Sequence, residues 1–202
     1  MAQDHFKRHN HYDGVVDWNF NVTFQDQPSV IDMADAYRPH LTRPDLYEPI
    51  PVQWIHATVL RVGTIDQYTE DEMLKVADMV QVRLNDIKMP QFHFGKYKII
   101  FGNIAFPIEP ESGLEKLYEI VTESLESVVG TERATKSPYG HFIAHTSFVY
   151  TRQRDSEDET EAILSSAKIK PASFHIKHMP LIKQKPVDGH YEWEVVKDIL
   201  VS

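Results

Sequence analysis

The chain has 202 residues, a formal net charge of −9, 42% hydrophobic residues and no cysteine. This length fits one domain, or two small lobes that share an interface. Without cysteine there is no disulfide, thiolate zinc site or cysteine nucleophile, and a reducing cytoplasm is the expected location. The acidic balance argues against binding to extended DNA, but it leaves room for a small nucleotide or an RNA end.

Residues 1–11 are polar and rich in histidine, and we expect a loose tail before a single domain over residues 12–202. The tail histidines His5, His9 and His11 could chelate a metal, but a solvated terminus is the favoured interpretation. The segment lacks the apolar stretch of a secretory signal, and no run in the chain approaches the ~20 apolar residues of a membrane span. We therefore expect no membrane partner, and a monomer.

The apolar pattern predicts helices and strands that are interleaved along the chain. Residues 14–24 alternate as in a strand, which would bury Val16, Trp18, Phe20, Val22 and Phe24 on one face. A helix follows from Pro28. The later predictions are helices over about 70–88, 112–130 and 157–168, and strand-like runs over about 92–101, 103–109, 173–184 and 189–200. Ser112 with Glu115, and Ser156 with Glu159, have the spacing of capping boxes.

The stretch Trp54-Ile55-His56-Ala57-Thr58-Val59-Leu60 is an apolar strand that carries one imidazole and one hydroxyl two residues apart. Alternate side chains of a strand share a face, so His56 and Thr58 are expected to project together. Ile55, Ala57 and Val59 would then point into the core.

The second half of the chain repeats this pattern at Ile143-Ala144-His145-Thr146-Ser147-Phe148-Val149. Here His145 and Ser147 share one face, and Ala144, Thr146 and Phe148 share the other. A helix pattern and two strand-like runs follow each motif, which indicates an internal duplication. A third match, His40-Leu41-Thr42, lies at the end of a predicted helix and is interpreted as chance.

Paired His-x-Thr/Ser strands in two similar halves resemble the 2H phosphoesterase superfamily, and within it the bacterial 2'-5' RNA ligase and cyclic phosphodiesterase group. The resemblance includes Trp54-Ile55, Val149-Tyr150 and the closing Tyr191-Glu192-Trp193. The chain departs from the commonest form by having Ser147 in place of threonine. The resemblance implies an α+β fold in which two lobes, related by a pseudo-twofold, form a central cleft between antiparallel-rich sheets with helices outside.

The chemistry explains these residue types. Opening a 2',3'-cyclic phosphate needs a base for water and an acid for the departing ribose oxygen, and imidazole can do either near neutral pH. His56 and His145 are therefore the predicted catalytic residues, without individual roles. Thr58 and Ser147 are the predicted substrate-binding residues, which donate to phosphate oxygens. No metal and no cofactor are expected.

Other candidates are weaker. His141 shares the strand parity of His145 and could flank the site, Tyr150 is expected in the core, and His93 is an isolated strand residue. His175 and His178 form an H-x-x-H pair, but on a predicted strand they point to opposite faces, which is unsuited to chelation. The pairs Arg152–Arg154 and Lys183–Lys185 are more simply solvated surface.

Two alternatives stay open beside the enzyme that acts on a nucleotide or RNA end. One is a non-catalytic nucleotide or RNA-end binding module on the same fold. The other is an α+β scaffold whose histidines are structural, which a structure with His56 and His145 far apart would favour.

Overall fold

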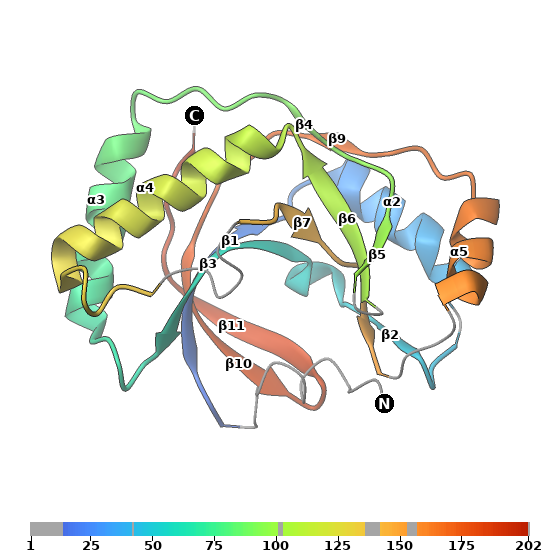
Figure 1. Cartoon of the computed structure of the whole chain (residues 1–202), viewed down its shortest axis with the longest axis horizontal. Helices are drawn as coiled ribbons and strands as arrows, with labels where there is room; N and C mark the ends of the chain where they lie inside the picture. Colours follow the sequence, from blue (N-terminus) through green and yellow to red (C-terminus); the bar gives the residue numbers. More distant parts are fainter. Residues whose placement is uncertain (1–13, 42, 101–102, 136–141, 153–156, 202) are drawn as a thin grey trace.

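The computed structural model describes residues 14–41, 43–100, 103–135, 142–152 and 157–201 (Figure 1). The helices are α2 (Pro28–Tyr37), α3 (Glu70–Leu84), α4 (Glu111–Val129) and α5 (Glu157–Ser166), with 3-10 turns η1 (Arg38–His40) and η2 (Val52–Trp54). The strands are β1 (Asp17–Thr23), β2 (Tyr47–Pro49), β3 (His56–Thr64), β4 (Phe92–Phe94), β5 (Lys98–Ile100), β6 (Asn103–Glu109), β7 (His145–Thr146), β8 (Val149–Thr151), β9 (Ser173–Phe174), β10 (Leu181–Val187) and β11 (His190–Lys197).

The first sheet has the strand order β11-β10-β1-β3, with antiparallel pairing throughout. Strand β3, which begins at His56, therefore lies at one end of this order. Its register with β1 places Thr23 opposite His56 and Asn21 opposite Thr58. Directly opposed residues of an antiparallel pair project from the same face, so Asn21 lies on the face that carries His56 and Thr58.

The second sheet is built around β6. Strands β4 and β5 pair with different parts of β6, β9 pairs with β4, and β7 also pairs with β6. The carbonyl of Pro107 accepts from Gly95 beside β4, while the next residue, Ile108, donates to Ala144 beside β7. The backbone groups of successive residues point to opposite sides of a strand, so β7 pairs along the side of β6 that faces away from β4. His56 thus begins β3, which pairs with β1 in the first sheet. His145 begins β7, which pairs with β6 in the second sheet.

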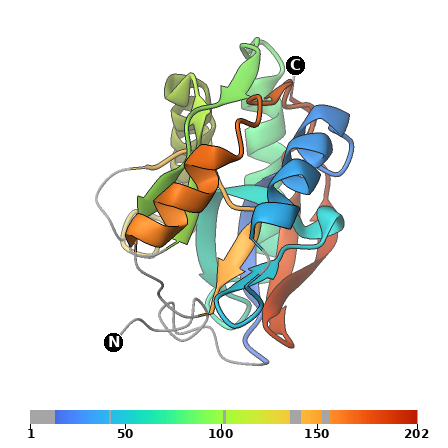
Figure 2. The same cartoon turned by 90° about the vertical axis from the view of Figure 1, so that its right-hand side faces the viewer.

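Helices α3 and α4 lie side by side at one end of the molecule, and α2 and α5 lie at the other (Figure 1). Figure 2 looks onto the end that carries α2 and α5. Helix α3 begins with a capping box in which Thr69 and Glu72 bond each other's backbone N–H groups. These helices bury their apolar faces against the sheets, which fixes the strands that bear the two histidines.

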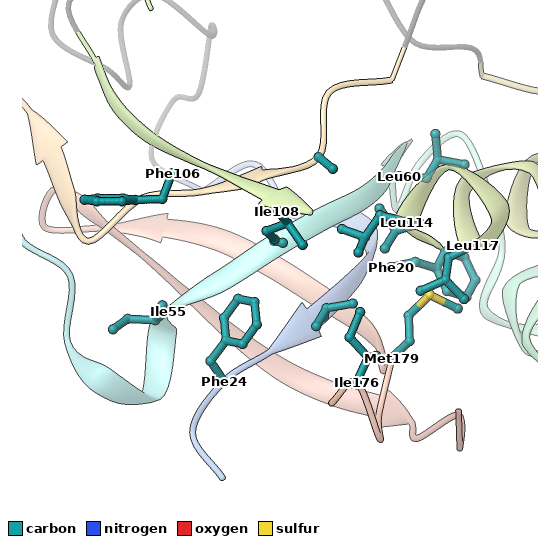
Figure 3. Packing of buried hydrophobic residues seen from close by; sticks show 14 of the residues in the cluster. Phe20, Phe24, Ile55, Leu60, Phe106, Ile108, Leu114, Leu117, Ile176 and Met179 are labelled. Atoms are coloured by element: carbon teal, nitrogen blue, oxygen red, sulfur yellow. The ribbon is translucent and has the colours of Figure 1, made fainter. Parts of the chain in front are cut away.

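Strands β2 and β8 form a third, two-stranded sheet. One hydrophobic cluster runs through the described chain and joins this third sheet to the two larger sheets (Figure 3). Phe24 and Ile55 lie together under the start of β3, and Phe106 and Ile108 of β6 face the same interior. Burial of this apolar surface is the main favourable term for holding the two sheets together. The predicted α+β class with antiparallel strands is therefore confirmed.

The structure corrects two local predictions. Helix α4 begins at Glu111 after Pro110, and no side chain caps it, so the predicted capping box of Ser112 and Glu115 is wrong. Gly113 packs directly against the Phe92 ring, within the first turn. The alternating pattern of β1 predicted one buried face, but Asp17, Asn19 and Asn21 on the other face are buried as well. The box predicted at Ser156 lies outside the described residues.

Candidate functional site

His56 is the first residue of β3, and its ring is half-buried. Thr58, two residues on, is exposed, while Ile55, Ala57 and Val59 are buried. The predicted alternation of β3 is therefore confirmed: the imidazole and the hydroxyl project to one side, and the apolar side chains project into the core.

His145 is the first residue of β7, and its side chain is exposed. Ala144, Thr146 and Phe148 are buried, which confirms the second alternation. The regular strand is short, because it ends at Thr146, and Ser147 and Phe148 lead into β8. Pairing of His145 with Pro107 of β6 fixes the backbone from which the imidazole projects.

Both imidazoles are held in the same way. The Nδ1 atom of His56 lies 2.8 Å from the carbonyl oxygen of Trp54, and Nδ1 of His145 lies 2.9 Å from that of Ile143. A carbonyl oxygen only accepts, so Nδ1 carries the proton in each ring. In the neutral form, each Nε2 then presents its lone pair away from the backbone. Two imidazoles with the same tautomer and the same support are thus available for proton transfer.

A hydrogen bond links the two histidine strands. The hydroxyl of Thr146, next to His145, donates to the carbonyl oxygen of His56 over 2.6 Å. The rings are also close enough that a positive charge on His145 lowers the pKa of His56. The structure therefore brings the two predicted histidines together, and it does not show the wide separation that would have favoured the scaffold alternative.

Aromatic rings surround His56. The Trp193 ring lies 5.1 Å from the imidazole, centroid to centroid, and the Tyr191 ring lies 6.4 Å away, both edge-on. Burial lowers the pKa of His56 to about 4, and the charge of His145 adds to this, although the hydrogen bond to Trp54 opposes it. His56 is therefore neutral at pH 7.

The two hydroxyls differ in their surroundings. Thr58 is exposed beside His56, where its hydroxyl can reach a ligand. Ser147 is half-buried, and its hydroxyl donates to the carbonyl oxygen of Ile104 over 2.8 Å. The Ser147 hydroxyl must give up this bond before its proton can be donated to a phosphate oxygen.

The remaining candidates lie elsewhere. His93 faces Glu109 at 3.2 Å, and the Nδ1 atom of His178 lies 2.7 Å from Asp198. Tyr150 is buried, as predicted, and burial is the main reason that its pKa is high. His141, Arg154 and the N-terminal tail with His5, His9 and His11 lie outside the described residues.

Sequence reasoning missed two contributors to this site. Thr146 was assigned only to the core, although a buried hydroxyl needs a hydrogen-bond partner, and that requirement was the available signal. Trp193 was known only as part of the closing hairpin, and its contact with His56 depends on how that hairpin curves.

Within the described residues, no group of three or more histidine, cysteine, aspartate or glutamate side chains is placed to hold a metal ion. No helix in the described ranges is long and apolar enough to cross a membrane.

The fold is similar to that of solved LigT and phosphoesterase structures, which agrees with the α+β class and antiparallel strands that the family resemblance implied. Apo LigT of E. coli aligns with a TM-score of 0.63 and 11% identity over 93% of this chain and 98% of LigT. TT0787 of Thermus thermophilus aligns with a TM-score of 0.63 and 14% identity, covering 93% and 97%. A solved phosphoesterase aligns with a TM-score of 0.60 and 11% identity, covering 95% and 99%.

No family model matches the sequence. No curated protein matches it either.

Proposed function

We propose that the chain is a metal-independent phosphoesterase that acts on 2',3'-cyclic phosphates of nucleotides or RNA ends, or joins RNA ends through a 2'-5' linkage at the same site. The observation that carries this proposal is the matched pair of imidazoles. Each ring donates from Nδ1 to the carbonyl two residues upstream, and the two strands are joined through Thr146. Two rings that share tautomer and support suit a reaction that needs one base and one acid.

The lowered pKa of His56 favours a neutral ring at that position, which suits the role of base, and the role of acid then falls to His145. In hydrolysis, Nε2 of neutral His56 takes a proton from water as the water oxygen bonds to phosphorus. The bond from phosphorus to one ribose oxygen breaks, and that oxygen takes the Nε2 proton of protonated His145. The water proton ends on His56, and the His145 proton ends on the ribose hydroxyl.

Ligation follows the same course with a 5'-hydroxyl in place of water: Nε2 of His56 takes the hydroxyl proton as that oxygen bonds to phosphorus, the bond from phosphorus to the ribose 3'-oxygen breaks, and that oxygen takes the Nε2 proton of His145. Thr58 and Ser147 would donate to the non-bridging oxygens, where negative charge grows in the transition state. Support also comes from the structural neighbours, since E. coli LigT has been solved with 3'-AMP, with phosphate and with ATP.

The test is a screen of purified protein against nucleoside 2',3'-cyclic phosphates, RNA ends with a cyclic phosphate, and 2'-5'-linked dinucleotides. The site variants are His56→Ala and His145→Ala. The matched control is His93→Ala, at an exposed histidine that faces Glu109. Turnover that both site variants lose and His93→Ala retains supports the proposal. Binding of these ligands without any turnover would favour the non-catalytic binding module instead.

A further inference from the structure

The tip of the β10–β11 hairpin extends past the strand that holds its base. Among the described residues, β10 pairs with β1 from Leu181 to Gln184, whereas its pairing with β11 continues to Val187 and His190 at the turn. Residues 185–192 therefore form the tip. A two-stranded hairpin is at best marginally stable by itself, so contacts with the rest of the chain must fix the position of this tip.

The position of the tip matters because it carries Tyr191. The Tyr191 ring lies 6.4 Å from the His56 imidazole, centroid to centroid, and the ring of Trp193, two residues on, lies 5.1 Å away. The titratable groups that face His56 are the Tyr191 phenol from β11 and His145 from β7. Rings at this distance keep water from the imidazole, and loss of water disfavours its charged form.

Two side chains from the segment that follows His145 hold the tip. The backbone N–H of Tyr191 donates to the Tyr150 hydroxyl over 3.3 Å, and the two rings meet edge to face at 5.7 Å. Arg152, the residue after β8, donates from Nη2 to the carbonyl oxygen of Gly189 over 2.8 Å. The tip is therefore bonded to the strand that continues from the second histidine motif.

Arg152 is itself fixed on its other side. Its Nε atom donates to Oε2 of Glu48 in β2 over 2.9 Å, and its Nη2 atom donates to the same oxygen. Its backbone N–H donates to the carbonyl oxygen of Leu46 over 2.6 Å. The side chain is only 20% exposed, although the sequence favoured a solvated position. One guanidinium group thus joins β2 to the turn of the hairpin.

The turn is suited to this contact because it has a glycine where the guanidinium lies. The φ angle of Gly189 is +81°, in the left-handed region that glycine adopts without strain. A Cβ atom at this position would also overlap the guanidinium of Arg152. The absence of a side chain lets the backbone of the turn come within hydrogen-bond distance of the arginine.

We propose that Arg152 is a positioning residue, which clasps the tip of the β10–β11 hairpin to β2 and so holds the Tyr191 ring against the imidazole of His56. Arg152 acts through the hairpin and not through its charge, because burial, a backbone hydrogen bond and the charge of His145 account for the pKa of His56. The role of His56 as a base rests on the proposed function, whereas its contact with the hairpin does not.

The test is an NMR titration of the histidine rings in the whole chain, which has 11 histidines. The signal that is missing in His56→Gln identifies His56. We expect Arg152→Met to move the pKa of His56 from about 4 toward its ordinary value near 6.5, because a freed tip lets water reach the ring. Arg152→Lys keeps the charge but not the planar fork of donors, so it should give a smaller rise.

The matched control is Arg83→Met. Arg83 of α3 pairs with Glu123 of α4 at 2.9 Å, so its loss breaks a similar ion pair between two helices. The control should leave the pKa of His56 unchanged. If Arg152→Met does not fold, Glu48→Ala replaces it, because it removes the other half of the ion pair and should shift the pKa in the same direction.

A folded Arg152→Met or Glu48→Ala chain whose His56 has the parent pKa would overturn the inference, as would an equal rise in Arg83→Met. The titration needs no substrate, so the clasp and the proposed function fail separately. In a chain that turns over a nucleoside 2',3'-cyclic phosphate, the acidic limb of kcat/KM should move to higher pH together with the NMR pKa. An NMR shift without turnover would support the clasp and contradict the enzyme.

Discussion

The Thr146 hydroxyl donates to the carbonyl oxygen of His56 over 2.6 Å, so the residue beside one imidazole holds the strand that begins with the other. Strand β3 belongs to one sheet and β7 to another, and β3 and β7 do not pair with each other among the described residues. The bond therefore links the two sheets. The relative position of the two rings depends on this bond. The bond also gives the buried Thr146 hydroxyl its hydrogen-bond partner.

Thr146→Val removes the hydroxyl and keeps the shape of the side chain. We expect it to reduce the free energy of unfolding by about 1–2 kcal/mol, because the His56 carbonyl loses its partner in a buried place. We also expect turnover to fall by about tenfold, because a small displacement of one catalytic group is costly. Urea unfolding and steady-state kinetics measure the two effects. Thr146→Ser, which keeps the hydroxyl, should restore most of both, and a Val variant with unchanged turnover would show that the rings do not need this link.

Thr58 and Ser147 should separate in their effects on stability. Thr58 is exposed, so Thr58→Val should leave unfolding unchanged while it weakens phosphate binding and turnover. Ser147→Ala should also cost about 1 kcal/mol of stability, because the Ile104 carbonyl loses a hydrogen bond. Thermal unfolding and inhibition by inorganic phosphate distinguish the two. If Thr58→Val bound phosphate as tightly as the parent chain, Thr58 would not be a phosphate ligand.

The lowered pKa of His56 predicts a pH dependence of stability. The folded chain holds the pKa of His56 at about 4, whereas an unfolded histidine titrates near 6.5. Between these values the unfolded state binds more protons, so this group makes stability rise with pH. The part of the free energy of unfolding that depends on His56 should therefore fall by about 2–3 kcal/mol as pH drops from about 6.5 to 4. Above pH 6.5 it should add no slope.

Denaturant unfolding of the parent chain and of His56→Gln over this range measures the difference, since carboxylates that titrate near pH 4 affect both alike. A flatter curve in the variant is the expected result. Identical slopes in the two chains would show that the folded protein does not depress the pKa of His56.

Chelation tests the proposed chemistry. Two imidazoles can supply both proton transfers, so turnover of a nucleoside 2',3'-cyclic phosphate should persist after dialysis against EDTA. The assay compares treated protein with and without added zinc or manganese. Loss of activity on chelation, with recovery on adding metal, would rule out the metal-independent mechanism and direct attention to His141 and the tail histidines.

Local periodicity predicted which side chains of the two motifs share a face, because the strand backbone alone fixes that alternation. The spacing rule for capping boxes failed at Ser112, because Pro110 precedes α4 and the helix begins at Glu111. The capping box at Thr69 and Glu72 had the required spacing but was not predicted.

Long-range contacts were beyond sequence reasoning. The bond of Ser147 to Ile104 requires knowing that β7 lies beside β6. The contact of Trp193 with His56 requires knowing how the β10–β11 hairpin curves toward β3. Family resemblance supplied the idea that the two histidine motifs meet, which neither composition nor spacing contains.

The central claim is that His56 and His145 act as one acid–base pair. The most direct measurement is turnover of a nucleoside 2',3'-cyclic phosphate by His56→Ala, His145→Ala and the double variant, each checked for folding. Each single variant should lose ~10²–10⁴-fold in kcat, because one proton transfer is lost. The kcat of the double variant should be only slightly below that of the slower single variant, because the two groups act together. Substantial turnover in either folded single variant would contradict the claim.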